Sequence, residues 1–374
     1  MRQPLARVGD PVANVATPAL VVDLDAMERN LAAMAVFARS HDVRLRPHAK
    51  MHKSAALAKA QIAAGAVGVC AQKVSEAEVL ADAGIADIFI SNEVIDTAKL
   101  ARVAELAGRI RLAVAVDSSL GVERLASACE AARSALDVFV EIDVGQGRCG
   151  VSPAAAGALA QHVVSRGLRF AGLQAYQGGA QHVRGAADRE AAARRAATLV
   201  RTAQEAIGSV GIECPLVTGG GTGTFVFDVE SGVYGELQVG SYLFMDVEYA
   251  DIEPPEHAPR FDHALFVKSQ VMSRSESHVV VDAGIKAYAI DSGLPRVLGR
   301  ELEMINYGDE HGILKPSGSG SSVELPRLGE TIWLVPGHCD PTVNLYDSYV
   351  AVRGGLDQGV VEALWQVDTR GCLV

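Results

Sequence analysis

The stretch Val43-Arg-Leu-Arg-Pro-His-Ala-Lys50 is the first of a series of β-rich runs, and it places a lysine just beyond the end of a strand. A partly desolvated lysine at such a position can lose its proton and act as a nucleophilic amine. Arg46 and His48 add positive charge beside it, which favours the neutral amine. Since most lysines are solvated surface groups, the assignment of Lys50 as a nucleophile depends on the rest of the chain.

Seven further β-rich runs follow, and segments of helical length separate them. The strands are predicted at 43–48, 67–70, 88–91, 112–116, 138–143, 170–176, 216–218 and 237–244, and the main helices at 54–64, 75–82, 97–106, 120–132, 153–165 and 188–207. Near-continuous apolar strands that alternate with helices are typical of a parallel sheet closed into a barrel. The sequence therefore predicts an α/β fold with a (β/α)8 TIM barrel over residues 24–250.

Polar side chains gather where these strands end. They are Lys50, Gln72, Asn92, Asp117, Asp143, Tyr176 and Thr218. The carboxyl ends of barrel strands carry the active site in essentially all barrel enzymes. A chance collection of loop residues is the alternative, and the chemical variety of the set disfavours it.

The pattern changes after about residue 262. Short β-rich runs at 265–271, 278–281, 331–335 and 348–353 are separated by Gly, Pro and Ser clusters, which is typical of an antiparallel β domain. The strand-like segment 20–23 has no place in the barrel and is expected to pair with this second domain, which then comprises 1–23 and 262–374. Residues 251–259 are predicted to be a linker and 317–322 a flexible loop.

Composition narrows the class of protein. The chain has 374 residues, 49% hydrophobic and 21% charged, with a net charge of −11 that argues against nucleic acid or an anionic membrane as a partner. No apolar run approaches the length of a membrane helix, and the N-terminus lacks a signal pattern. The six cysteines show no C-x-x-C spacing, which indicates free thiols. We expect a cytoplasmic protein.

The run Thr218-Gly-Gly-Gly-Thr-Gly-Thr224 is a glycine-rich turn after the seventh strand. Glycines allow consecutive backbone N–H groups to point into one concavity that binds phosphate. Barrels commonly bind phosphate in the loops after strands seven and eight. A plain turn is the alternative, and the position in the barrel favours phosphate.

Three side chains on neighbouring loops are candidates for contact with a ligand. Arg148 lies in a second glycine-rich turn, where it could donate to a ring nitrogen or a carboxylate or form a salt bridge with Asp143. Tyr176 ends the sixth strand and can stack or form hydrogen bonds. His182 follows shortly after and is a candidate general base.

The motif His338-Cys339-Asp340 follows the predicted strand 331–335. In an extended segment alternate residues share a face, so His338 and Asp340 are expected to point together and Cys339 away. Imidazole and carboxylate together form a two-ligand site for a divalent cation, and the carboxylate favours Mn or Mg over Zn. A loop histidine capped by an aspartate is the alternative.

These segments together resemble the family of D-threonine aldolases and D-serine dehydratases, fold-type III pyridoxal phosphate enzymes related to the alanine racemases. The resemblance runs from residues 17–21 to 361–365 and is closest to the aldolases. Its specific motifs lie at 46–50, 70–76, 90–93, 144–150, 173–176, 218–223, 282–284 and 338–341.

The resemblance implies roles for the candidate residues. Lys50 would form the Schiff base with pyridoxal 5'-phosphate, and Arg148 would face its pyridine nitrogen. Further residues around the cofactor would be Gln72, Tyr176, Tyr234 and the phosphate-loop residues Thr218, Gly220, Gly221 and Thr222. His338 and Asp340 would hold the metal near the β-hydroxyl of the substrate. The H-x-D motif is similar to the aldolase pattern, whereas H-x-C is similar to that of the zinc dehydratases.

We therefore expect a pyridoxal phosphate- and metal-dependent aldolase that cleaves D-3-hydroxy-amino acids of the D-threonine type to glycine and an aldehyde. His182 or a metal-bound hydroxide would be the base. A D-serine or D-3-hydroxyaspartate dehydratase on the same scaffold is the alternative, and a non-catalytic pyridoxal phosphate carrier is disfavoured by the second domain. Gln177 departs from the histidine often found there in the family, which leaves the substrate side chain open. The related racemases also imply a homodimer.

Overall fold

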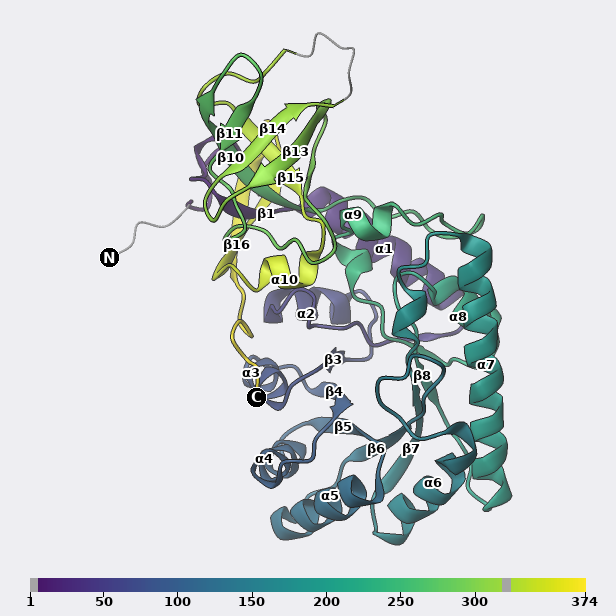
Figure 1. Ribbon diagram of the computed structural model, residues 1–374. Helices are drawn as coiled ribbons and strands as arrows, with labels where there is room; N and C mark the ends of the chain where they lie inside the picture. Colours follow the sequence, from purple (N-terminus) through teal and green to yellow (C-terminus); the bar gives the residue numbers. More distant parts are fainter. Residues whose placement is uncertain (1–5, 318–323) are drawn as a thin grey trace.

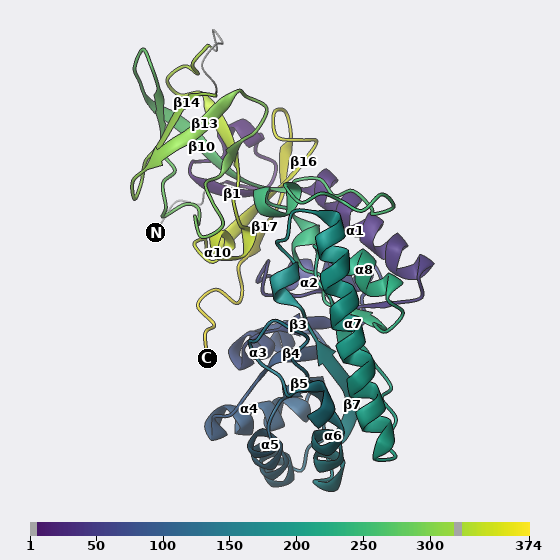
Figure 2. The same cartoon turned by 45° about the vertical axis from the view of Figure 1, so that its right-hand side comes forward.

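The computed structural model describes residues 6–317 and 324–374, so most of the loop predicted at 317–322 lies outside the described residues. Figure 1 shows two parts: a barrel wrapped by helices and, above its mouth, a β-rich part that contains both the N-terminal strand and the C-terminal third of the chain. Figure 2 shows the same two parts after rotation.

Eight parallel strands form the barrel sheet, in the order β2-β9-β8-β7-β6-β5-β4-β3. They are β2 (Arg44–Leu45), β3 (Val69–Ala71), β4 (Asp87–Glu93), β5 (Arg111–Val116), β6 (Asp137–Glu141), β7 (Arg169–Ala175), β8 (Val217–Gly219) and β9 (Glu236–Leu237). The ends of the sheet meet where the amide of Cys70 donates to the carbonyl of Pro47 and the amide of Ala49 donates to the carbonyl of Cys70. The predicted (β/α)8 barrel is confirmed.

The helices cover the outer face of this sheet (Figure 1). They are α1 (Leu24–Ser40), α2 (Ala55–Ala63), α3 (Val74–Asp82), α4 (Thr97–Ala107), α5 (Ser119–Ala132), α6 (Ala156–Ser165), α7 (Ala186–Ser209) and α8 (Phe225–Glu230). Apolar residues at helical spacing, such as Leu100 and Val103 of α4, pack with Leu112 and Val114 of β5 in one buried cluster. Alternation along the strands directs a second, smaller cluster that includes Phe89 and Phe139 to the barrel interior.

One predicted strand is mostly wrong. The run 237–244 contributes only the last residue of β9, and Ser241–Leu243 forms a 3-10 turn. The apolar residues of this run are buried as expected. Ladder hydrogen bonds continue only to Val239, whose carbonyl accepts the amide of His48, and the chain then turns away from the sheet. The amide of Tyr242 donates to Thr222 Oγ1 instead, which ties this turn to the glycine-rich loop.

The second sheet has nine strands. They are β1 (Ala19–Asp23), β10 (Leu265–Arg274), β11 (Val279–Val281), β12 (Arg296–Val297), β13 (Leu302–Tyr307), β14 (Gly312–Pro316), β15 (Thr331–Val335), β16 (Ser348–Arg353) and β17 (Val360–Gln366). Strand β1 pairs antiparallel with β10 and parallel with β16, which confirms that the N-terminal strand belongs with this sheet. The other pairs are antiparallel, as predicted. The domain limits drawn from the sequence stay a prediction.

Two short helices, α9 (Val247–Ala250) and α10 (Cys339–Val343), lie between the two parts. Asp246 holds them together, because its carboxylate accepts the amide of Tyr249 in α9 and the amide of Cys339 in α10. The start of α10 is thereby fixed over the barrel mouth. No helix among the described residues is both long and apolar enough to cross a membrane.

Candidate active site

A cavity opens at the carboxyl end of the barrel strands, beneath α10, with about 760 Å³ of empty space including its open mouth. Most of the predicted site residues line it: Lys50, Gln72, Arg148, Tyr176, His182, Gly221, Thr222, His338 and Asp340. The fold thus brings together residues from five barrel loops and the second domain. Thr218, Gly220 and Tyr234 do not line this cavity.

The surroundings of Lys50 differ from the expectation. The Arg46 guanidinium is buried in ion pairs with Asp87 and Glu236, at 2.5 Å and 3.1 Å, so its charge is compensated. Burial holds the pKa of His48 well below its ordinary value, and the charge of Lys50 lowers it further. His48 is therefore neutral, and the expectation that Arg46 and His48 supply free positive charge beside Lys50 is wrong.

Gln72 and His48 form a small polar network next to Lys50. Gln72 Nε2 lies 2.8 Å from His48 Nε2, and the Ser91 hydroxyl lies 3.2 Å from the same ring nitrogen. His48 Nδ1 faces the amide of Lys50 at 3.4 Å. A neutral imidazole accepts through one ring nitrogen and donates through the other. With Nδ1 accepting the amide of Lys50, Nε2 carries the proton and faces the Ser91 hydroxyl, and the network fixes the turn that carries Lys50.

The backbone of the glycine-rich loop after β8 packs closely against Gln181. Gly220 has a φ of +72°, and a Cβ on Gly221 would lie 2.4 Å from Gln181 Oε1, so larger residues fit neither position. Gln181 is locked, because it accepts the amide of Gly223 and donates to the Thr224 hydroxyl. Among the described residues, the amide of Thr222 finds no hydrogen-bond partner. A free amide at the wall of the cavity fits a bound phosphate.

Thr218 and Arg189 support this loop from behind. Thr218 is fully buried in β8 and donates to Glu236, which also binds Arg46. Arg189 of α7 is fully buried and donates to the carbonyl of Gly223 at 3.0 Å and to the carbonyls of Val183 and Arg184. Within an Ala- and Arg-rich helix, Arg189 gave no sequence signal of this role.

Arg148 extends over the ring of Tyr176, with 5.4 Å between its Cζ and the ring centroid. Its Nη2 lies 3.4 Å from Glu141 Oε1. The alternative of a salt bridge with Asp143 is wrong, because one carboxylate oxygen of Asp143 accepts the amides of Gly145, Gln146 and Gly147. Burial raises the pKa of Tyr176 to about 12, so its phenol remains protonated.

Tyr234 lies in the barrel core. It is buried, and its hydroxyl donates to the carbonyl of Ala175 at 3.0 Å. Gln177, the departure from the family pattern, also does not line the cavity. Its amide donates to the carbonyl of Val144 and accepts the amide of Gly179, so it joins two barrel loops.

His182 has an orienting partner that the sequence did not reveal. His182 Nδ1 lies 2.8 Å from Glu248 Oε1, and the ring lies 5.5 Å from that of Tyr249. This contact leaves Nε2 of His182 available at the cavity wall. A carboxylate on one ring nitrogen fixes the tautomer and the orientation of a general base.

His338 and Asp340 meet at the top of the cavity, with 3.7 Å between Nε2 and Oδ2. His338 Nδ1 contacts Asp291 Oδ2 at 2.6 Å. The pair points together and Cys339 away, as predicted, but the segment is not extended, because α10 begins at Cys339. Cys339 is fully buried, with its thiol against the carbonyl of Met245.

The side chains present fit both implied groups. Two metal bonds of about 2.1 Å can span the 3.7 Å between His338 Nε2 and Asp340 Oδ2. The contact of Asp291 with the other ring nitrogen is the outer-shell arrangement usual for a metal-binding histidine. A half-buried lysine, a locked glycine loop and an arginine in one cavity fit pyridoxal phosphate.

Comparison with known proteins identifies the family. The alanine racemase N-terminal domain matches residues 22–248, and the putative serine dehydratase domain matches residues 264–352. The chain is 45% identical to a D-threonine aldolase of Arthrobacter sp. over 98% of this chain and 96% of the relative. It is 42% identical to a 3-hydroxy-D-aspartate aldolase of Paracoccus denitrificans over 96% of this chain and 92% of the relative. The crystal structure of a D-threonine aldolase from Filomicrobium marinum superposes with a TM-score of 0.95, at 49% identity, and covers 99% of this chain and 100% of that one.

Proposed function

Since the chain belongs to the family of D-threonine aldolases, with an alanine racemase-like barrel, we propose that the cavity at the barrel mouth is its catalytic site. The protein is a pyridoxal phosphate-dependent aldolase that cleaves D-3-hydroxy-amino acids to glycine and an aldehyde. The observation that carries the site assignment is that Lys50, the locked glycine loop and the His338–Asp340 pair face one cavity.

The cofactor would be held at four points. Lys50 would bind it covalently, Gly221 and the free amide of Thr222 would hold its phosphate, Arg148 would contact its ring nitrogen, and Tyr176 would lie beside the ring. Pyridoxal phosphate supplies the electron sink for the charge left on Cα when the Cα–Cβ bond breaks. The side chain of Gln72 is positioned by contacts with His48 and Ser91, next to the turn that carries Lys50.

His182 accepts the proton of the substrate's β-hydroxyl. Its contact with Glu248 leaves one ring nitrogen as the acceptor and stabilises the charge that the imidazole gains. Proton removal at this oxygen converts it into the carbonyl of the leaving aldehyde. Tyr249, next to His182 and also at the cavity wall, excludes water from this side.

His338 and Asp340 would hold a divalent metal at the substrate's β-oxygen, where it acts as a Lewis acid. One imidazole and one carboxylate leave an open, oxygen-rich coordination sphere, so we propose Mn or Mg rather than Zn. Asp291 positions the His338 ring for this role.

The substrate is proposed to be a D-3-hydroxy-amino acid whose side chain is methyl, phenyl or carboxylate. A D-threonine aldolase and a 3-hydroxy-D-aspartate aldolase are similar to this chain to nearly the same extent, at 45% and 42% identity.

The assembly is proposed to be a cytoplasmic homodimer in which the β domain of one subunit covers the barrel mouth of the other. The cavity is open to solvent on one side in the single chain. A carbanion at Cα must be shielded from water, and a second subunit can provide that cover.

Product analysis tests the reaction. The purified protein, supplied with pyridoxal phosphate and Mn, is incubated with D-threonine, with Lys50→Ala as the matched control. Glycine and acetaldehyde are expected in equal amounts from the wild type and neither from the variant. Release of ammonia and a 2-oxo acid from D-threonine would assign a dehydratase instead.

A further inference from the structure

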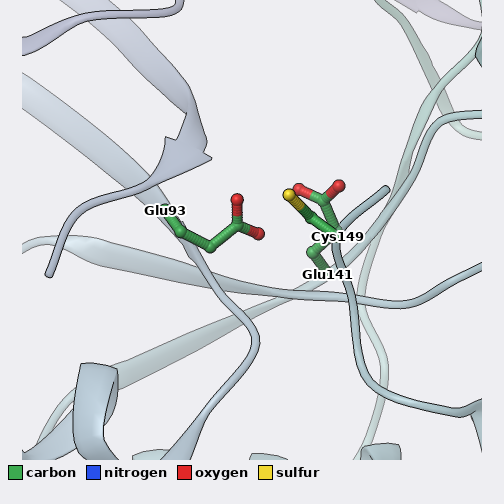
Figure 3. A group of neighbouring side chains, drawn as sticks. All are labelled: Glu93, Glu141 and Cys149. Carbon is green, nitrogen blue, oxygen red and sulfur yellow. The ribbon is translucent and has the colours of Figure 1, made fainter. Parts of the chain in front are cut away.

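Figure 3 shows three side chains that gather at one place: Glu93, Glu141 and Cys149. They do not line the cavity, but Glu141 contacts Arg148, which does. Glu93 ends β4, Glu141 ends β6 and Cys149 follows in the next loop, and their ligand atoms lie within 4.8 Å of one another. Glu141 is 3% exposed. Glu141 Oε2 and Glu93 Oε1 are buried, and neither has a hydrogen-bond partner among the described residues.

The charges around this pair do not balance if both carboxyl groups ionise. Arg148 is the cation that contacts it, through Glu141 Oε1 at 3.4 Å. Asp117, on the loop after β5, is directed at the amide of Gly150. Burial and the two carboxyl groups raise the pKa of Cys149 to about 11, so its thiol is neutral. Two carboxylates against one guanidinium would leave an uncompensated buried negative charge, which is costly.

A single shared proton accounts for the two unpartnered carboxyl oxygens and for the excess negative charge. Placed between Glu93 and Glu141, it gives the two facing carboxyl groups a donor and leaves one negative charge for Arg148. Burial, followed by the charge of Glu93, raises the pKa of Glu141 to about 8, in agreement with this geometry.

We propose that Glu93 and Glu141 share one proton and, as a singly charged pair, position Arg148 against the ring nitrogen of the cofactor. The second half of this inference rests on the proposed site. A divalent cation bound by Glu93, Glu141 and Cys149 is the competing occupant. It is disfavoured because it needs a thiolate and lies next to the Arg148 guanidinium.

Infrared difference spectroscopy of the purified holoenzyme tests the shared proton. At about pH 7 the C=O band of a protonated carboxyl group is expected in the wild type and in the exposed control Glu105→Gln. The band should be lost in Glu93→Gln and in Glu141→Gln, since either variant leaves a single carboxyl group with no second carboxylate to oppose its ionisation. In the wild type it should disappear as the pH rises through about 8. Superimposable spectra of wild type and Glu93→Gln would overturn the proposal.

Cofactor dissociation tests the positioning of Arg148. Glu141→Gln replaces the carboxylate that contacts Arg148 by a neutral amide, whereas Glu93→Gln retains that carboxylate, so Glu141→Gln should raise the dissociation constant of pyridoxal phosphate at least tenfold more. The visible spectrum of the bound cofactor should also change through about pH 8 in the wild type more than in Glu93→Gln. Equal cofactor binding by the two variants would overturn the positioning role.

Metal analysis decides the competing occupant. His338→Ala is expected to retain no metal after dialysis against a chelator. One equivalent of metal that remains in His338→Ala, and is lost in the double variant His338→Ala/Cys149→Ser, would show a cation site at Glu93, Glu141 and Cys149 and overturn the shared proton. A protein that cleaves no D-3-hydroxy-amino acid would refute the proposed function, while the infrared band would still decide the shared proton.

Discussion

Replacing Glu248 with glutamine tests the proposed base and its orientation in one step. Glu248 Oε1 lies 2.8 Å from His182 Nδ1, and the glutamine amide removes the negative charge with little change in shape. A neutral amide can also present its NH2 group to Nδ1 and thereby favour the wrong tautomer. We expect a lower rate with an unchanged fold.

The size of the effect follows from the exposure of the pair. A hydrogen bond to a charged group is worth about 1.5–3 kcal/mol. The side chains of His182 and Glu248 are 45% and 22% exposed, so solvent weakens the contact and the lower value applies. About 1.5 kcal/mol corresponds to roughly a tenfold loss in kcat/KM.

The assay is the initial rate of glycine formation from D-threonine at saturating pyridoxal phosphate and Mn. Glu256→Gln, an exposed change in the linker, is the control and should behave as wild type. His182→Ala should lose more, about 100-fold or beyond. A Glu248→Gln rate equal to wild type would refute the reasoning, because the orientation of His182 would then not matter.

Three further predictions concern the cofactor, the fold and the assembly. Lys50→Ala should abolish turnover and the visible absorbance of bound cofactor; cofactor that stays covalently attached after borohydride reduction and dialysis would move the attachment to Lys53 or Lys73. Burial lowers the pKa of His52 from 6.5 to about 4, so unfolding should take up a proton and the wild type should lose about 2–3 kcal/mol of stability from about pH 7 to pH 4.5. Denaturant unfolding of His52→Gln should show a correspondingly smaller loss, and equal losses would contradict this. Light scattering under assay conditions should find a dimer, and an active monomer would contradict the proposed assembly.

The barrel and its mouth were predictable because their signals are local. Apolar runs at regular spacing gave the strands, and a polar residue directly after each strand end, such as Gln72 or Tyr176, is carried by the fold to a common face. The prediction that His338 and Asp340 point the same way is also correct, although the two side chains meet at the start of a helix rather than along an extended segment.

Partners that are distant in the chain were not predictable. Glu248 is separated from His182 by the whole of α7, β8 and β9, and the Glu93–Glu141 pair joins strands β4 and β6, which flank β5 in the barrel sheet. The run 237–244 has strand composition, but only residues 237–239 bond to neighbouring strands, whereas the amide of Tyr242 donates to Thr222 Oγ1. Burial alone does not specify the hydrogen-bond partner.

The metal dependence of cleavage is the sharpest test of the proposal that His338 and Asp340 hold a catalytic metal. The holoenzyme is dialysed against EDTA, shown by metal analysis to be metal-free, and assayed with D-threonine before and after Mn, Mg or Zn is added. We expect the cofactor to stay bound and cleavage to be lost in the metal-free enzyme. Mn or Mg should restore cleavage better than Zn in the wild type but not in Asp340→Ala. Full glycine and acetaldehyde production by the metal-free enzyme would contradict this proposal and would reduce His338 and Asp340 to a structural loop.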